Sequence, residues 1–129
     1  MSRAGASARR RASTLIHGTL VFWRGAGLLL RGASGAGKSD LALRLIEAGG
    51  RLVADDQVAA ALDDGRPRGR APEALEGLME VRGIGIVPVS RRAEAPIDIV
   101  VELVPAERIE RIPESLTTVI LGADIPLVH

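Results

Sequence analysis

The chain has 129 residues, of which 47% are hydrophobic and only 2% aromatic, so we expect one domain with a core of aliphatic side chains. It contains no cysteine, which excludes disulfides, thiolate metal sites and a cysteine nucleophile, and which fits the cytoplasm. The formal net charge is only +1, but no acidic residue precedes Asp40 and the first third is therefore basic.

The basic start of the chain is interpreted as a solvated, disordered tail over residues 1–12, which leaves 13–129 as a single folded domain. A transit peptide is disfavoured because residues 14–23 already have the pattern of a folded strand. The apolar run after the arginines is also interrupted by His17 and Gly18, which argues against a secretory signal.

Neither a nucleic acid nor a membrane is an expected partner. Nucleic-acid binding would call for aromatic or further basic residues near the tail, and only Phe22, Trp23 and Arg24 are close to it. No apolar stretch approaches the roughly 20 residues that a membrane-spanning helix needs.

Apolar periodicity and turn residues predict a mixed α/β domain. The pattern begins with a hairpin, continues through a helix that ends at a pair of glycines, and finishes with strands. In chain order we expect strands over 15–23 and 28–31, a helix over about 38–48, a strand over 51–54, a hairpin and loop over 58–70, a short helix or loop over 72–78, an apolar segment over 79–89, a buried central strand within 97–104, a charged helix or loop over 107–114, and strands over 117–121 and 125–128.

A glycine-rich segment, residues 32–39, separates the strand over 28–31 from the helix and matches G-x-x-x-x-G-K-[ST]. Its glycines permit backbone dihedrals that would let successive N–H groups face phosphate oxygens, and the helix start adds its own amides. Lys38 would reach the β/γ-phosphates, and the Ser39 hydroxyl would bind Mg²⁺. The segment therefore predicts a nucleotide phosphate site made of Gly32, Ala33, Ser34, Gly35, Ala36, Gly37, Lys38 and Ser39.

Two adjacent carboxylates, Asp55 and Asp56, follow the strand over 51–54. A strand, a crossover helix and a second strand of the same direction would bring this pair to the sheet edge that carries Lys38 and Ser39. One acid could then support Mg²⁺ while the other accepts a proton from the attacking oxygen. The alternative is a pair of turn or capping aspartates.

Three smaller features have both a chemical and a structural interpretation. His17 could shuttle a proton or orient a carboxylate, or it could be an ordinary strand residue. Glu80 and Arg82 share one face of a short strand, which is either a solvent face or a metal-supporting acid beside a phosphate-binding guanidinium. The segment 83–85 begins like a dinucleotide fingerprint, but Pro88 stands where the third glycine is needed, so a Rossmann site is rejected.

Three segments together resemble bacterial HPr kinase/phosphorylase. They are residues 32–39, Leu-Val-Ala-Asp-Asp at 52–56 and Met-Glu-Val-Arg-Gly-Ile-Gly-Ile at 79–86. The His-Gly-x-Leu-Val segment from His17 also matches. The resemblance covers roughly residues 14–129 and implies a P-loop kinase core of the phosphoenolpyruvate carboxykinase-like type, commonly assembled as a hexamer. It implies an enzyme that uses ATP or pyrophosphate to phosphorylate a serine of HPr, and that reverses the reaction with inorganic phosphate.

The resemblance also assigns roles to single residues. Asp55 would be the base in the kinase direction and the acid in reverse, beside His17. Ser39, Asp56 and Glu80 would hold Mg²⁺ directly or through its shell. Arg82 would belong to the signature that is linked to phosphorolysis.

The chain departs from the family pattern at several points. Asp40 replaces a glutamate, and the arginine loop is shortened to something within 107–114. The N-terminal domain and terminal helices of long members are not in the sequence, so we expect a short form that reverses the reaction poorly. Two other interpretations stay open, a P-loop kinase for a small metabolite and a nucleotide-gated regulatory binding module.

Overall fold

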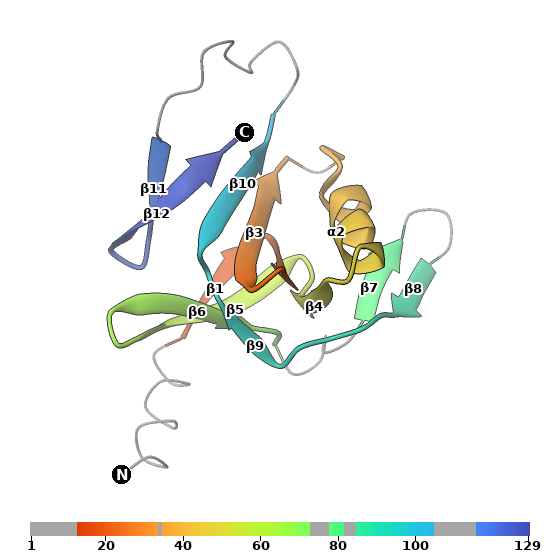
Figure 1. The fold of residues 1–129 in the computed structure, drawn as a ribbon, viewed down its shortest axis with the longest axis horizontal. Helices are drawn as coiled ribbons and strands as arrows, with labels where there is room; N and C mark the ends of the chain where they lie inside the picture. Colours follow the sequence, from red (N-terminus) through yellow and green to blue (C-terminus); the bar gives the residue numbers. More distant parts are fainter. Residues whose placement is uncertain (1–12, 34, 73–77, 82–84, 105–115) are drawn as a thin grey trace.

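The computed structural model describes residues 13–33, 35–72, 78–81, 85–104 and 116–129. They form a six-stranded sheet, a four-stranded sheet and a two-stranded hairpin, together with one helix within the described residues (Figure 1). The helix is α2 (Lys38–Glu47), and the hairpin consists of β7 (Leu78–Val81) and β8 (Gly85–Pro88).

The six-stranded sheet has the order β11-β12-β10-β3-β2-β4. Its strands are β2 (Thr19–Trp23), β3 (Ala26–Gly32), β4 (Arg51–Ala54), β10 (Ile99–Leu103), β11 (Leu116–Ile120) and β12 (Ala123–Val128). β10 is parallel to both β3 and β12, whereas β2 is antiparallel to both β3 and β4. β3 and β4 therefore run in the same direction, with β2 between them.

The four-stranded sheet is antiparallel throughout, in the order β1-β5-β6-β9. Its strands are β1 (Thr14–His17), β5 (Gln57–Asp63), β6 (Arg66–Arg70) and β9 (Glu94–Pro96). The mixed-sheet α/β class predicted from the sequence is confirmed.

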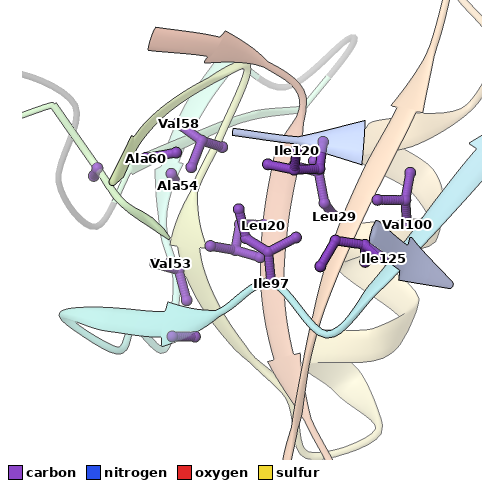
Figure 2. Close-up of a cluster of buried hydrophobic side chains, with 12 residues drawn as sticks. Leu20, Leu29, Val53, Ala54, Val58, Ala60, Ile97, Val100, Ile120 and Ile125 are labelled. Carbon is purple, nitrogen blue, oxygen red and sulfur yellow. The ribbon is translucent and has the colours of Figure 1, made fainter. Parts of the chain in front are cut away.

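The uninterrupted apolar run of β3 is explained by burial on both faces of its sheet. Leu29 belongs to the core cluster shown in Figure 2, which also contains Leu20, Val58 and Ile97 and so joins the two large sheets. Leu30, on the opposite face, belongs to a second cluster with Ala42 of α2. Side chains alternate between faces along a strand, so a strand covered on both sides needs no polar positions.

The predicted strand over 15–23 is divided by Gly18 into β1 and β2, which belong to different sheets. Gly18 has a φ of 153°, and a Cβ at this position would lie 2.9 Å from Leu29 Cδ1 and 3.0 Å from the Leu30 carbonyl oxygen. The close approach to β3 accounts for a glycine at the division.

Most of the remaining elements agree with the sequence prediction, but β9 was not predicted, and the apolar segment expected over 79–89 contains two paired strands, β7 and β8. The helix, the β5–β6 hairpin and the two final strands lie within a few residues of their expected bounds. The central strand is β10, between β3 and β12. The predicted segments over 72–78 and 107–114, and the tail over 1–12, lie wholly or mostly outside the described residues. No described helix has the length and apolar character needed to cross a bilayer.

The two large sheets are tied together at the start of β3. The Gly27 amide donates to Asp98 Oδ2 at 2.8 Å, and the Asp98 amide donates to the Gly27 carbonyl at 2.9 Å. A Cβ on Gly27 would overlap the carbonyl oxygen of Pro96. The junction between β9 and β10 can therefore lie against β3 only because residue 27 has no side chain.

We expect Gly27→Ala to lower the free energy of unfolding by about 3 kcal/mol or more, because the obstacle is backbone and no side chain can rotate out of the way. Gly25→Ala, in the turn just before β3, is the matched control. Gly25 has a φ of 81° but no neighbour near a Cβ, so only the left-handed backbone cost of about 1–2 kcal/mol applies. Urea unfolding of both variants measures the difference, and equal losses would contradict the packing argument.

Candidate functional site

The glycine-rich segment over 32–39, here called the glycine loop, joins the end of β3 to the start of α2. A Cβ on Gly32 would lie 2.9 Å from the Leu103 carbonyl oxygen, so this glycine allows β10 to come close. Gly35 and Gly37 have φ values of 84° and 104° with open space around them. Their requirement is conformational, as the sequence predicted.

The start of α2 leaves backbone donors without a side-chain cap. Its N-cap is Gly37 in the left-handed conformation, which has no side chain to offer to the amides of the first turn. The Leu41 amide donates to the Gly37 carbonyl at 3.0 Å and begins the helical ladder. The amides ahead of Leu41 have no helical acceptor, and they lie at the positive end of the helix dipole, which favours an anion.

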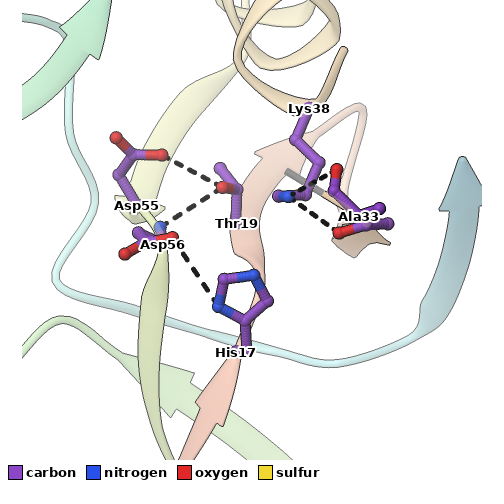
Figure 3. Close-up of polar contacts among 7 residues, drawn as sticks. His17, Thr19, Ala33, Lys38, Asp55 and Asp56 are labelled. Carbon is purple, nitrogen blue, oxygen red and sulfur yellow. Dashed lines mark hydrogen bonds and ion pairs between the residues drawn. The ribbon is translucent and has the colours of Figure 1, made fainter. Parts of the chain in front are cut away.

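Lys38 turns back over the glycine loop (Figure 3). Its Nζ donates to the Gly32 carbonyl at 2.9 Å and lies 3.5 Å from the Ala33 carbonyl. A separate backbone hydrogen bond, from the Ala36 amide to the Ala33 carbonyl at 2.9 Å, closes a turn within the loop. The Lys38 ammonium is thus held against the loop by the loop's own backbone carbonyls.

The acid pair, Asp55 and Asp56, directly follows the end of β4. β4 has the same direction as β3, so the acid pair and the glycine loop leave the sheet at the same edge. This is the juxtaposition that the strand–helix–strand pattern predicted.

The pairing of β4 with β2 shifts by one residue just before the acid pair. Val21 of β2 is opposite Leu52, but the next pair joins Leu20 to Ala54. Val53 is therefore the extra residue of a bulge. Val53 and Ala54 both belong to the core cluster between the sheets, although adjacent strand residues normally face opposite ways.

The bulge determines what the acid pair faces. Continuing the shifted register places Asp55 opposite Thr19 and Asp56 opposite Gly18. Both relations are observed, since Thr19 Oγ1 donates to Asp55 Oδ1 at 3.0 Å and the Gly18 amide donates to the Asp56 carbonyl at 3.0 Å. In unshifted register Asp55 would be opposite Gly18, with its side chain on the other face of the sheet from α2.

Asp56 makes a sharp turn with a φ of 70°, and its amide donates to Thr19 Oγ1 at 3.3 Å. Its Oδ1 lies 3.6 Å from His17 Nδ1, with both side chains more than 60% exposed. The resemblance placed His17 beside Asp55, whereas the structure pairs it with Asp56 (Figure 3). The reason is strand register, because His17 is opposite Gln57, the residue that follows Asp56.

The other predicted site residues are placed only in part. Ser39 is the second residue of α2, whereas Ser34 and Arg82 lie outside the described residues. Glu80 is described by its backbone alone, in β7, opposite Ile86. Within the described part of the chain, no three His, Cys, Asp or Glu side chains gather closely enough to hold a metal ion by themselves.

Sequence reasoning overlooked Thr19. It is the buried polar side chain among the described residues, with 1% of its surface exposed, and it contacts both members of the acid pair. The available signal was a hydroxyl residue at the head of the otherwise apolar strand Thr-Leu-Val-Phe-Trp. Its partners are 36 and 37 residues away in the sequence, so no local pattern could identify them.

Comparison with known proteins identifies the family. The HPr Serine kinase C-terminal domain family model matches residues 9–129. The HPr kinase/phosphorylase of Lactobacillus acidophilus is 40% identical over 126 residues, which are 88% of this chain and 39% of that protein. The protein of the same name from Clostridium perfringens is 52% identical over 77 residues, which are 60% of this chain and 25% of that protein.

The solved structure of the Hpr(Ser) kinase/phosphatase from Coxiella burnetii superimposes with a TM-score of 0.83 at 25% identity. The match covers 89% of this chain and 77% of that one. The chain spans 39% or less of the curated relatives described above. With the match to the family model extending from residue 9 to residue 129, the chain belongs to the HPr Serine kinase C-terminal domain family.

Proposed function

We propose that this domain transfers phosphate from ATP to a serine of an HPr-type phosphocarrier protein, and so acts in regulation of the phosphotransferase system. The same site would reverse the reaction with inorganic phosphate and release pyrophosphate. The observation that carries the proposal is the common sheet edge that holds Lys38 and the acid pair. In this proposal the core is of the phosphoenolpyruvate carboxykinase-like P-loop type, with α2 as the crossover helix.

The residues of the glycine loop suit the phosphates of a nucleotide. Its uncapped amides and the Lys38 ammonium are donors of the kind that bind anionic oxygens. Transfer would require Lys38 to exchange its bonds to backbone carbonyls for bonds to phosphate. Arg82 would add a second cation near the transferred group.

The oxygen donors present suit Mg²⁺ bound together with a nucleotide. Mg²⁺ usually keeps several waters and is bound through one or two carboxylates plus substrate phosphates, so a cluster of three protein acids is not required. Ser39 and Asp56 would be its protein ligands, with Glu80 supporting its shell. When bound, the ion would neutralise charge on the phosphates.

The acid pair would divide the remaining work. As the serine Oγ forms its bond to the γ-phosphorus and the bond to the ADP oxygen breaks, Asp55 accepts the serine proton. In reverse, a phosphate oxygen attacks the phosphoserine, and Asp55 returns the proton to the departing serine oxygen. His17 would orient Asp56, its observed neighbour.

The decisive experiment is single-turnover transfer from γ-labelled ATP and Mg²⁺ to purified HPr. Transfer to HPr supports the proposal. Transfer to a metabolite alone would favour a small-molecule kinase, and nucleotide-dependent binding of HPr without transfer would favour a regulatory module.

Because ATP is the proposed donor, we expect a cytoplasmic reaction. The hexamer implied by the resemblance stays a prediction, which light scattering can test.

We expect Lys38→Ala to lower phosphate transfer by about 10³-fold, because the lost ammonium stabilises charge on the transferred group. The fold should be retained, since the described hydrogen bonds of the Lys38 ammonium go to loop carbonyls and not to the core. Arg44→Ala, an exposed cation on the same helix, is the control and should leave transfer unchanged. Near-normal turnover of Lys38→Ala would exclude the proposed role of the glycine loop.

We expect Asp55→Asn and Asp56→Asn to fail in different ways. Asp55→Asn removes the proton acceptor and should lower kcat by about 10²–10⁴-fold with nearly unchanged nucleotide affinity. Asp56→Asn should weaken binding of Mg²⁺–ATP. Nucleotide titration and saturating kinetics separate the two effects, and the opposite assignment would mean that the two acids have exchanged roles.

A further inference from the structure

We propose that the Thr19 hydroxyl is a positioning group that sets the orientation of Asp55 and the turn at Asp56. The inference rests on the proposed function, because the proposed function is what gives Asp55 a catalytic task. It concerns a residue outside the predicted site, and it is carried by contacts within the described chain.

The burial of Thr19 requires an explanation. A hydroxyl taken out of water without partners costs free energy, and a valine would fill the same space at the head of β2 without that cost. Thr19 has only 1% of its surface exposed, and no described buried side-chain polar atom lacks a hydrogen-bond partner. The two contacts with the acid pair therefore satisfy the hydrogen-bonding capacity of the buried Thr19 hydroxyl.

The hydroxyl has one hydrogen, and its two contacts use it in complementary ways. It donates that hydrogen to Asp55 Oδ1 at 3.0 Å, and its oxygen accepts the Asp56 amide at 3.3 Å. Donation to Asp55 fixes one carboxylate oxygen, and the second oxygen is then placed by covalent geometry. Acceptance from Asp56 holds the backbone in the left-handed turn, with its φ of 70°.

The bulge at Val53 gives Thr19 this double role. The register shift that brings Asp55 opposite Thr19 also places Asp55 on the face of β4 that carries α2. The bulge therefore sets the face, and the hydroxyl sets the orientation within that face. Bulges next to active sites re-aim side chains in this way.

The test compares Thr19→Val with Thr19→Ser. Valine keeps the shape and removes the hydroxyl, so we expect kcat for transfer to HPr to fall about 10- to 100-fold, because small misplacements of reacting groups have costs of this size. The KM for ATP should rise less than in Asp56→Asn, because the turn at Asp56 relaxes while its carboxylate and the glycine loop are retained, so kcat is compared at saturating Mg²⁺–ATP. Serine keeps the hydroxyl and should restore most of kcat.

A double-mutant cycle with Asp55→Asn distinguishes positioning from general loosening of the fold. If Thr19 acts through Asp55, Thr19→Val should lower kcat by about twofold or less once Asp55 is asparagine. Equal losses in both backgrounds, or a Thr19→Val enzyme with normal kcat, would overturn the inference while leaving the proposed function intact.

A crystal structure of Thr19→Val provides a readout that does not need activity. We expect Asp55 to leave its single orientation or to occupy several, and we expect the turn at Asp56 to relax. An unchanged Asp55 side chain would overturn the inference. If the wild-type protein transfers no phosphate to HPr, the proposed function fails, and this structural comparison still decides the role of Thr19.

Discussion

The one-residue shift in the pairing of β2 with β4 is the constraint on which the candidate site depends. Leu52 must face α2, whereas Val53 and Ala54 fill the space between the sheets. A regular strand alternates its side chains between the two faces, so Val53 and Ala54 could not both face the space between the sheets. The extra residue of the bulge allows both to do so. As a consequence Asp55 returns to the α2 face, where the glycine loop begins. Packing of the core thus sets the direction of the acid pair.

A second requirement is close approach of backbone segments without side chains between them. Gly18 allows the chain to pass from one sheet to the other against Leu29, and Gly32 allows β10 to lie against the start of the glycine loop. These two glycines lie beside the strand ends that lead to the acid pair and to the glycine loop. Their contribution is spatial, whereas Gly35 and Gly37 contribute backbone conformation. The strands thereby support a loop that leads into a helix start without a side-chain cap.

Local signals were sufficient to predict much of this structure. The glycine loop, α2 and the β5–β6 hairpin each have a turn, cap or periodicity that is contained within a few residues, and the shared edge followed from the chain direction of β3 and β4. The neighbour of His17 and the role of Thr19 could not be predicted in this way. Both depend on which residues of distant strands are opposite one another, and a bulge changes that register without a local signature. The family itself came from motif resemblance and was then confirmed by comparison.

The parallel pairing of β3 with β10 has a consequence for how the domain is made. The Arg31–Glu102 ion pair, at 2.8 Å, links residues 71 positions apart at the ends of these two strands. β2, β3, α2 and β4 are consecutive and can associate as soon as they leave the ribosome, but β10 must wait for most of the chain to be translated. Pairings of such long sequence separation form slowly, because a large loop has to close first. The edge of β3 that β10 will cover is thus exposed during synthesis, and the support beneath Gly32 is completed late.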